Sequence, residues 1–322
     1  MIAGRPRPPW LALVPALLAM CAPPHVQDIR PTMLPWDAPL PAFWQQPAEL
    51  SDQNLFDGPW GAAYAPQAGA EYTLERRTSD EDMPELIVTD GNGRRWAVAP
   101  ERDAHRGHGS IEVVLSRVLS ALGYHQPPVY FVPSFALRDA RGVHVETGGR
   151  FRREDGPMQV RDRWSWEQNP FVGMRPYQGL LVVLLMFNAS NIDSANNTLY
   201  DVVRPEKPAR WYVVRDLAAT LGPAGLAAGR SPGAFARGPF ITGVDAGFVA
   251  FDYAGPHAAL VRGRIPPDDV GWVAFVLSRL TDRQWQDAFR AGGYTPAAAT
   301  RYIAALRVRI EHARRIGGDD WP

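Results

Sequence analysis

The N-terminal half of the chain contains short stretches in which hydrophobic and polar residues alternate, which is the period of a half-buried β-strand. We expect strands at residues 72–76 and 85–89, and a third strand that includes Trp96 and Val98. The residues Asp-Gly-Asn-Gly at 90–93 separate the second stretch from the third, and such a turn is typical of a β-hairpin. The pattern therefore predicts a small β-rich unit.

A helical period follows this unit. Between residues 110 and 123 one face of a helix would carry Ile111, Val114, Leu115, Val118 and Leu122. Ser110 is expected to cap the N-terminus of this helix, and Gly123 to end it. The apolar run after Pro127 and Pro128 predicts one more strand, which ends near residue 135.

The second half of the chain reads as mainly helical. We expect a buried helix at 178–187, a polar loop after it, and a strand at 210–216 that places Asp216 at its end. Residues 245–247 predict the turn of a hairpin. Three helices then close the chain, at about 268–280, 281–292 and 295–317, the second beginning with Thr281 and Gln284 at the spacing of a capping box.

The N-terminus has the features of an export signal. Arg5 and Arg7 precede an apolar run that ends at Cys21, the single cysteine of the chain. A cysteine in this place is typical of a bacterial lipoprotein, in which the thiol is lipidated; an ordinary signal peptide or a free thiol is the alternative. The proline-rich segment 22–52 would then be a tether from the membrane to the folded part.

Composition narrows the function. In 322 residues, 34 basic side chains balance 34 acidic ones, and we expect no nucleic-acid partner. The basic residues are almost all arginine, because Lys207 is the only lysine. With 46% hydrophobic residues, the chain is able to bury a large core.

The order of these elements predicts an α+β fold with two lobes. Residues 53–135 would form a small β-rich N-lobe with one helix, residues 136–317 a larger and mainly helical C-lobe, and residues 318–322 a tail. This order resembles that of protein kinases. A kinase catalytic loop carries an aspartate that accepts the substrate proton and, five residues later, an asparagine that binds metal; a second aspartate holds the metal on the phosphates.

Asn191 and Asn196 have this five-residue spacing, and Asp216 follows at the end of the next predicted strand. The resemblance implies that Asn191 stands at the catalytic base position. It also implies that Asn196 and Asp216 are metal ligands, with Mg²⁺ or Mn²⁺ bound together with a nucleotide. If the site is not of this kind, we expect no cofactor.

Longer motifs resemble a group of exported bacterial proteins with an atypical kinase-like fold, similar to HipA-like toxin kinases and CotH-like spore-coat kinases. The matching segments lie at 90–96, 112–128, 164–171 and 280–294. In this group the glutamate at 112 would pair with a phosphate-binding lysine on the strand that ends at residue 99.

Two positions depart from this pattern. Ala99 stands where the lysine is expected, and Asn191 stands where the base is expected. An amide is not a base, so Asn191 cannot accept a proton as a carboxylate does.

Each candidate residue also has a structural interpretation. Glu112 could pair with an arginine, Asp216 could cap a turn, and Asp193 could either replace the base or cap its own loop. His257 could reach a cleft or be structural. Asn188 and Asn197 are expected to bond loop backbone, and Trp164 and Trp166 to pack between the lobes.

These observations leave two leading hypotheses. The first is an exported, lipid-anchored pseudokinase of the bacterial cell envelope, which has lost phosphoryl transfer and binds a small-molecule or protein partner. The second is an active, metal-dependent phosphotransferase in which Arg94, Arg95 or Arg102 replaces the missing lysine. A structural envelope protein would explain the anchor but not the presence of Asn196 and Asp216.

Overall fold

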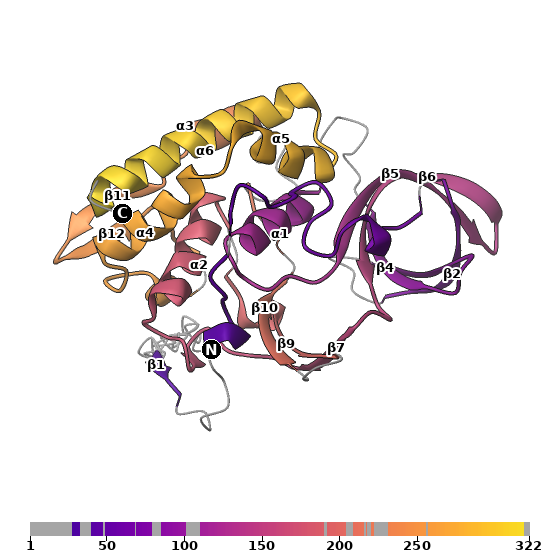
Figure 1. Ribbon diagram of the computed structural model, residues 1–322, viewed down its shortest axis with the longest axis horizontal. Coiled ribbons are helices and arrows are strands. Elements are labelled where there is room, and N and C mark those ends of the chain that lie inside the picture. Colours follow the sequence, from indigo (N-terminus) through magenta and orange to yellow (C-terminus); the bar gives the residue numbers. More distant parts are fainter. Residues whose placement is uncertain are drawn as a thin grey trace, which may run out of the picture.

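A computed structural model describes residues 28–32, 40–47, 49–67, 69–78, 85–100, 110–189, 192–203, 209–215, 217, 220–221, 231–255 and 257–318, with the side chain of Asn196 excepted. The fold mixes α and β structure. A closed barrel of strands lies at one end of the molecule, most of the helices gather at the other end, and helix α1 lies between them (Figure 1). The candidate site is built where α1 meets the barrel.

The barrel has five strands in the order β2-β3-β4-β6-β5, and parallel pairing of β2 with β5 closes it. Its strands are β2 Glu71–Arg77, β3 Leu86–Asp90, β4 Arg95–Pro100, β5 Val129–Asp139 and β6 Gly142–Arg153. Large side chains fill its interior, with Tyr72, Trp96 and Phe151 fully buried. The three strands and the hairpin turn expected between residues 72 and 98 are therefore confirmed.

The strand-rich part is longer than the sequence indicated. Residue 135, where the lobe boundary was expected, lies within β5, and β6 was not predicted. On β6 the apolar Phe151 stands between Arg150 and Arg152, and consecutive side chains of a strand point to opposite faces. Hydrophobic and polar residues do alternate here. Arg150 and Arg152 point away from the barrel interior, and as charged residues they resemble surface positions, although both are buried in the folded protein.

Apart from the short α3, which was not predicted, the helices agree closely with the predicted pattern. They are α1 Ile111–Ala121, α2 Arg175–Met186, α3 Pro232–Arg237, α4 Pro267–Ser278, α5 Asp282–Ala291 and α6 Pro296–Gly317. Thr281 and Gln284 form the predicted capping box at α5. Short 3-10 turns lie at Leu40–Ala42, Ala62–Tyr64, Ser194–Asn196 and Ala258–Leu260. The pattern of capping residues was thus a reliable guide to the helical part.

Small sheets complete the fold. A three-stranded sheet contains β7 Met158–Asp162, β9 Asn197–Val202 and β10 Ala209–Val214, and the predicted hairpin at 245–247 joins β11 Ile241–Asp245 to β12 Phe248–Phe251. Two further short strands, β1 Arg30–Pro31 and β8 Gln168–Asn169, pair in parallel. β9 and β10 pair along their whole length, so the end of β10 lies beside the start of β9.

Part of the segment expected to be a tether belongs to the folded core. Phe43 is buried and stacks on Phe171 with ring centroids 4.7 Å apart, and Leu50 is also buried. The prolines around these residues prevent regular structure, but their apolar neighbours still find a place in the core. Within the described residues, no helix is both long and apolar enough to span a bilayer.

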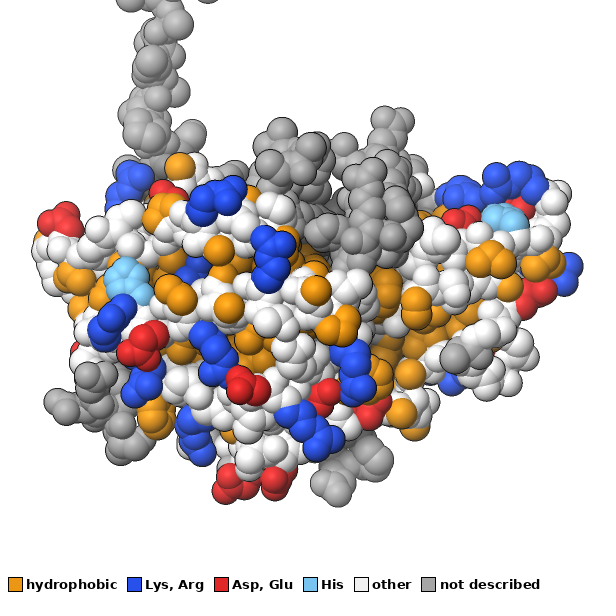
Figure 2. Space-filling view, turned by 90° about the horizontal axis from the view of Figure 1, so that it is seen from above, with side chains coloured by type: hydrophobic (Ala, Val, Ile, Leu, Met, Phe, Trp, Pro, Cys, Tyr) orange, Lys and Arg blue, Asp and Glu red, His pale blue; other side chains and the backbone are white. Residues whose placement is uncertain are grey.

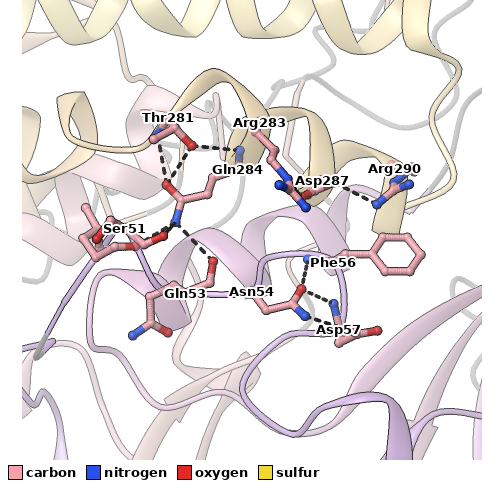
Figure 3. A network of polar contacts seen from close by, with 11 residues as sticks. Ser51, Gln53, Asn54, Phe56, Asp57, Thr281, Arg283, Gln284, Asp287 and Arg290 are labelled. Carbon is pink, nitrogen blue, oxygen red and sulfur yellow. Dashed lines mark hydrogen bonds and ion pairs between the residues drawn. The ribbon is translucent and has the colours of Figure 1, made fainter.

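Residues 49–58 form a strap that runs over α5 and α1. The Gln284 amide donates hydrogen bonds to the carbonyl oxygens of Leu50, Ser51 and Gln53, at 2.7, 3.3 and 3.1 Å (Figure 3). The guanidinium of Arg290 lies over the ring of Phe56, 4.2 Å from its centroid. The capping box therefore serves two purposes, because Gln284 both starts α5 and holds the strap.

Arg309 of α6 joins the end of α2 to α3. Its Nη1 donates to the carbonyl of Met186 and to the side-chain oxygen of Asn188, at 2.6 and 2.7 Å. Its Nη2 donates to the carbonyls of Phe235 and Gly238, at 2.9 and 3.0 Å. The side chain of Asn188 therefore accepts a hydrogen bond from an arginine, whereas a hydrogen bond to loop backbone had been expected. Burial lowers the pKa of Arg309 to about 10, so the group remains charged.

The Arg309 contacts predict a large loss of stability in Arg309→Met. The substitution keeps most of the volume but leaves buried carbonyls without donors, and we expect the free energy of unfolding to fall by about 3 kcal/mol. Arg307→Met is the matched control on the same helix, because Arg307 is partly exposed and pairs with the exposed Asp282. It should change stability by less than about 0.5 kcal/mol. Urea denaturation measures both, and equal losses would show that Arg309 has no special role.

Candidate functional site

The structure describes only some of the residues predicted for the site. Ala99, Glu112 and Asp193 are described, and so is the backbone of Asn196, which ends the 3-10 turn before β9. Asn191 and Asp216 lie outside the described residues, as do Arg102 and Cys21. The base position, the metal pair and the lipidation site therefore stay predictions.

Arg150 lies beside Ala99, the position at which the resemblance implies a lysine. In the ladder between β4 and β6, Ala99 pairs directly with Arg150. Side chains of paired residues lie on the same face of a sheet with their Cβ atoms about 5 Å apart. The small side chain of Ala99 therefore stands next to a guanidinium carried by the neighbouring strand.

Glu112 of α1 pairs with this guanidinium. Its Oε2 lies 3.0 Å from Arg150 Nε, and both side chains are buried. Of the two interpretations of Glu112, the arginine pair is the one found. Because Arg150 belongs to the barrel and Glu112 to the helix, this ion pair fixes the position of α1 on the barrel.

A second carboxylate, from Glu85, bridges two arginines of β6. Its Oε1 accepts from Arg150 Nη2 at 2.7 Å, and its Oε2 accepts from Arg152 Nη2 at 3.1 Å. Burial raises the pKa of Glu85, but attraction to Arg152 and Arg150, together with the hydrogen bond from Arg150, outweighs burial and holds this pKa below 4.5. Glu85 is thus ionised at neutral pH.

Arg215 brings the chain after β10 to the same cluster. It lies close enough to Glu85 to contribute to the lowering of that pKa, and its Nη1 donates to the Tyr200 hydroxyl at 3.0 Å. Arg215 directly precedes Asp216 in the sequence. Among the described residues, three guanidinium groups therefore converge on two carboxylates, Glu85 and Glu112.

Helix α1 is held from its other sides as well. The Ser110 amide donates to the carbonyl of Gly292 at 2.7 Å, whereas its hydroxyl makes no capping bond, contrary to expectation. Arg117 Nη2 donates to the carbonyl of Val129 at 2.7 Å, and its guanidinium lies over the ring of Tyr130. Burial lowers the pKa of Arg117 to about 10. The helix is therefore anchored to the barrel and to the end of α5.

The other arginines considered from sequence have different partners. Arg94 pairs with Asp90 of the hairpin turn at 2.8 Å, and Arg95 pairs with Glu75 at 2.9 Å. Both arginines are therefore engaged by carboxylates of the barrel, and a role for either on a phosphate stays a prediction. The guanidinium that lies beside Ala99 belongs instead to β6, a strand that the sequence did not predict.

The loop before β9 is held by a second polar cluster. Asp193 accepts from the amide of Ala195 at 2.8 Å, which is the loop-capping interpretation of this residue. The Ser194 hydroxyl donates to Glu167 Oε2 at 3.2 Å, and Glu167 Oε1 lies 2.7 Å from His257 Nδ1. These contacts fix the loop to residues 167 and 257, and they agree with a structural role for His257.

Asn197, the first residue of β9, is fully buried. Neither atom of its amide has a hydrogen-bond partner, contrary to the expected backbone contact. Trp164 and Trp166 are buried in one aromatic cluster, with ring centroids 4.8 Å apart. No group of three or more His, Cys, Asp or Glu side chains suited to a metal ion occurs in the described part of the chain.

Glu85, Arg150 and Arg152 were missed from the sequence. Arg150 and Arg152 stand two residues apart on either side of an aromatic residue, and this spacing was the available signal. Charged side chains of both signs are interspersed over the surface shown in Figure 2, where single-sign patches are not prominent. The buried cluster of charged residues is therefore a better candidate for a binding site than this exposed face.

The cluster is chemically suited to an anion. Arginine presents several N–H donors in a fixed plane, a geometry that matches carboxylate and phosphate oxygens. In a buried setting these contacts are much stronger than at the surface. The arrangement is thus suited to binding and orienting such a group.

Comparisons with known proteins add a weak structural similarity. No protein-family model matches the chain, and no curated protein matches it significantly. Among solved structures, the chain is similar to one described as "Crystal structure of the golgi casein kinase", with 10% identity and a TM-score of 0.41. The match covers 79% of this chain and 72% of the other.

Proposed function

We propose that this chain is a kinase-like domain that binds a phosphate-bearing ligand, such as a nucleotide, and does not transfer the phosphoryl group. The order of its parts supports this proposal. A five-stranded unit with one helix precedes a mainly helical part, in which a polar loop leads into β9 and a strand ends next to Asp216. Protein kinases have corresponding parts: a strand lysine, a helix glutamate, a catalytic loop and a metal-binding aspartate.

The observation that carries the proposal is the Glu112–Arg150 ion pair beside Ala99. In kinases a lysine–glutamate pair between strand and helix positions the phosphates. Here the helix supplies the same carboxylate, while the cation comes from the neighbouring strand. The loss of the lysine at position 99 is therefore compensated by a guanidinium in register with it.

The proposed absence of transfer rests on the loop. Asn191 stands at the base position, and Asp193 is engaged with the amide of Ala195. Removing a general base typically lowers a rate by about 10²–10⁴-fold. We propose that Asn196 and Asp216 still hold Mg²⁺ or Mn²⁺ on the ligand, because carboxylate and amide oxygens suit these hard cations.

A second candidate function is slow phosphoryl transfer. The observation in its favour is again Arg150. If this guanidinium binds phosphate, the domain lacks the catalytic base but keeps the phosphate-binding cation. Phosphoryl transfer depends mainly on positioning and on charge stabilisation, so some activity is compatible with a missing base.

We further propose that the protein is exported to the bacterial cell envelope and anchored through Cys21. The charged and apolar N-terminal sequence supports this proposal. A small-molecule or protein partner would then meet the site outside the cytoplasm.

Binding predicts a thermal shift. ATP or ADP with Mg²⁺ or Mn²⁺ should raise the unfolding midpoint by several degrees at 100-fold excess over Kd, since such binding stabilises by about 2.7 kcal/mol. The paired variant Arg150→Met with Glu112→Gln, which leaves no unpaired charge between the two, should lose the shift. Arg138→Met is the control, because Arg138 forms an exposed pair with Glu71 on the same barrel.

Each midpoint is compared with that of the same variant without ligand, so a change in intrinsic stability does not enter the result. Absence of any shift in the wild type at saturating ligand would contradict the binding proposal. A full shift in the paired variant would show that binding occurs elsewhere.

The two candidate functions differ in a radiolabel transfer assay. Wild-type protein with ATP and Mg²⁺ or Mn²⁺ should label neither itself nor a generic acceptor above background. Asn191→Asp should gain transfer, because Arg150 already supplies the cation and the base is the missing part. Wild-type transfer that disappears in Asp216→Ala would instead establish the second candidate.

Lipidation is tested by membrane fractionation of the full chain expressed in a bacterium. Cys21→Ser should move the protein from the membrane to the soluble fraction, because one thioether-linked lipid group can no longer form. Ser116→Ala is a control that leaves Cys21 unchanged. A Cys21→Ser variant that stays in the membrane fraction as fully as the wild type would exclude the proposed anchor.

A further inference from the structure

Glu85 holds two buried arginines in a way that a phosphate group also would. One carboxylate oxygen accepts from Arg150 at 2.7 Å and the other accepts from Arg152 at 3.1 Å, so the group bridges two guanidinium planes. Both arginines are buried, whereas the Glu85 side chain keeps 18% of its surface exposed. The bridge is therefore at the solvent-facing side of the cluster.

Glu85 is not the residue that attaches α1 to the barrel. That contact is made by Glu112, which approaches Arg150 from Nε at 3.0 Å, while Glu85 approaches it from Nη2. Arg152 has a weaker second neighbour in Glu154, at 3.8 Å. Removing Glu85 would thus leave the helix–barrel ion pair in place.

Glu85 is held in the chain by its backbone. It stands directly before β3, and its backbone forms two hydrogen bonds with Thr78, the residue after β2. Residues 79–84 join these two positions and include Asp80, Glu81 and Asp82. The two bonds to Thr78 use backbone atoms of Glu85, so a rotation of its carboxylate leaves them in place.

Arg215 adds positive charge near the same cluster. Arg215 is close enough to Glu85 to affect its ionisation, and it belongs to the segment after β10. An anion with two phosphate groups has enough oxygens to contact Arg150 and Arg152 together and to reach toward Arg215. A single carboxylate satisfies only the first two.

We infer that Glu85 is an internal substitute for the ligand, and that a pyrophosphate-class anion binds by displacing it from Arg150 and Arg152. This inference rests on the proposed function and adds the mode of binding. In the ligand-free protein Glu85 neutralises the buried arginines. The ligand replaces one carboxylate by a group of higher charge, and Glu85 moves into water.

The test is calorimetric titration with inorganic pyrophosphate, which has no base or sugar. Glu85→Gln removes the competing charge and should lower the Kd for pyrophosphate by at least about tenfold. Glu75→Gln is the matched control, because it makes the same charge change at an exposed pair with Arg95 on the barrel. Its Kd should stay within about twofold of the wild-type value.

A second measurement uses the unaltered protein and does not depend on the folding of a variant. In hydrogen exchange followed by mass spectrometry, pyrophosphate should slow exchange in residues 148–153 and accelerate it in residues 78–86. The acceleration is the specific sign, because a ligand that only adds contacts slows exchange everywhere that it acts. Slower exchange in both segments would overturn the displacement.

The outcomes separate this inference from the proposed function. Nucleotide binding with no gain for pyrophosphate in Glu85→Gln would leave the proposed function intact and exclude Glu85 as a competitor. No binding of nucleotide or pyrophosphate by either the wild type or Glu85→Gln would reject both. Pyrophosphate binding by Glu85→Gln that Arg152→Gln then removes would establish the arginine pair as the site.

Discussion

The ion pair between Glu112 and Arg150 is the constraint on which the arrangement of the site depends. It joins helix α1, which lies between the barrel and most of the other helices, to strand β6 of the barrel. Removing one partner of a buried pair typically costs about 3–5 kcal/mol, because the other charge is left without compensation. The position of α1 is therefore set by electrostatics as well as by its apolar faces, and the same contact orients the guanidinium that the proposed ligand would meet.

Buried charges are a poor way to gain stability. Hydrophobic residues of similar size often stabilise a core as well as or better than an ion pair, since two charges lose their hydration when they are buried. The cluster of Glu85, Glu112, Arg150 and Arg152 is therefore better explained by a function that needs guanidinium groups in a dry setting. Arg309 offers a contrast within the same chain, because it donates four hydrogen bonds to neutral oxygens that need donors. The burial of Arg309 is therefore explained by its structural role alone.

The sequence predicted the elements better than the site. Periodicity located α1, and capping residues such as Thr281 and Thr295 located the helices near the C-terminus, because both signals are local. β6 was missed because Arg150 and Arg152 have the polarity of surface residues, and only the tertiary structure shows that they are buried and paired. Arg94 and Arg95 are close to Ala99 in the sequence, but the guanidinium that lies beside Ala99 belongs to a strand about fifty residues later. Pairing between distant strands is not encoded in any local pattern.

The central claim is that Arg150 binds phosphate in place of the absent lysine. A crystal structure with pyrophosphate and Mn²⁺ tests it most directly, because the anomalous signal of the metal locates the ion independently of the phosphate density. The account predicts a phosphate oxygen about 3 Å from the Arg150 guanidinium, with the Glu112–Arg150 pair retained. Phosphate density away from β6, with Arg150 still held by both Glu85 and Glu112, would contradict it.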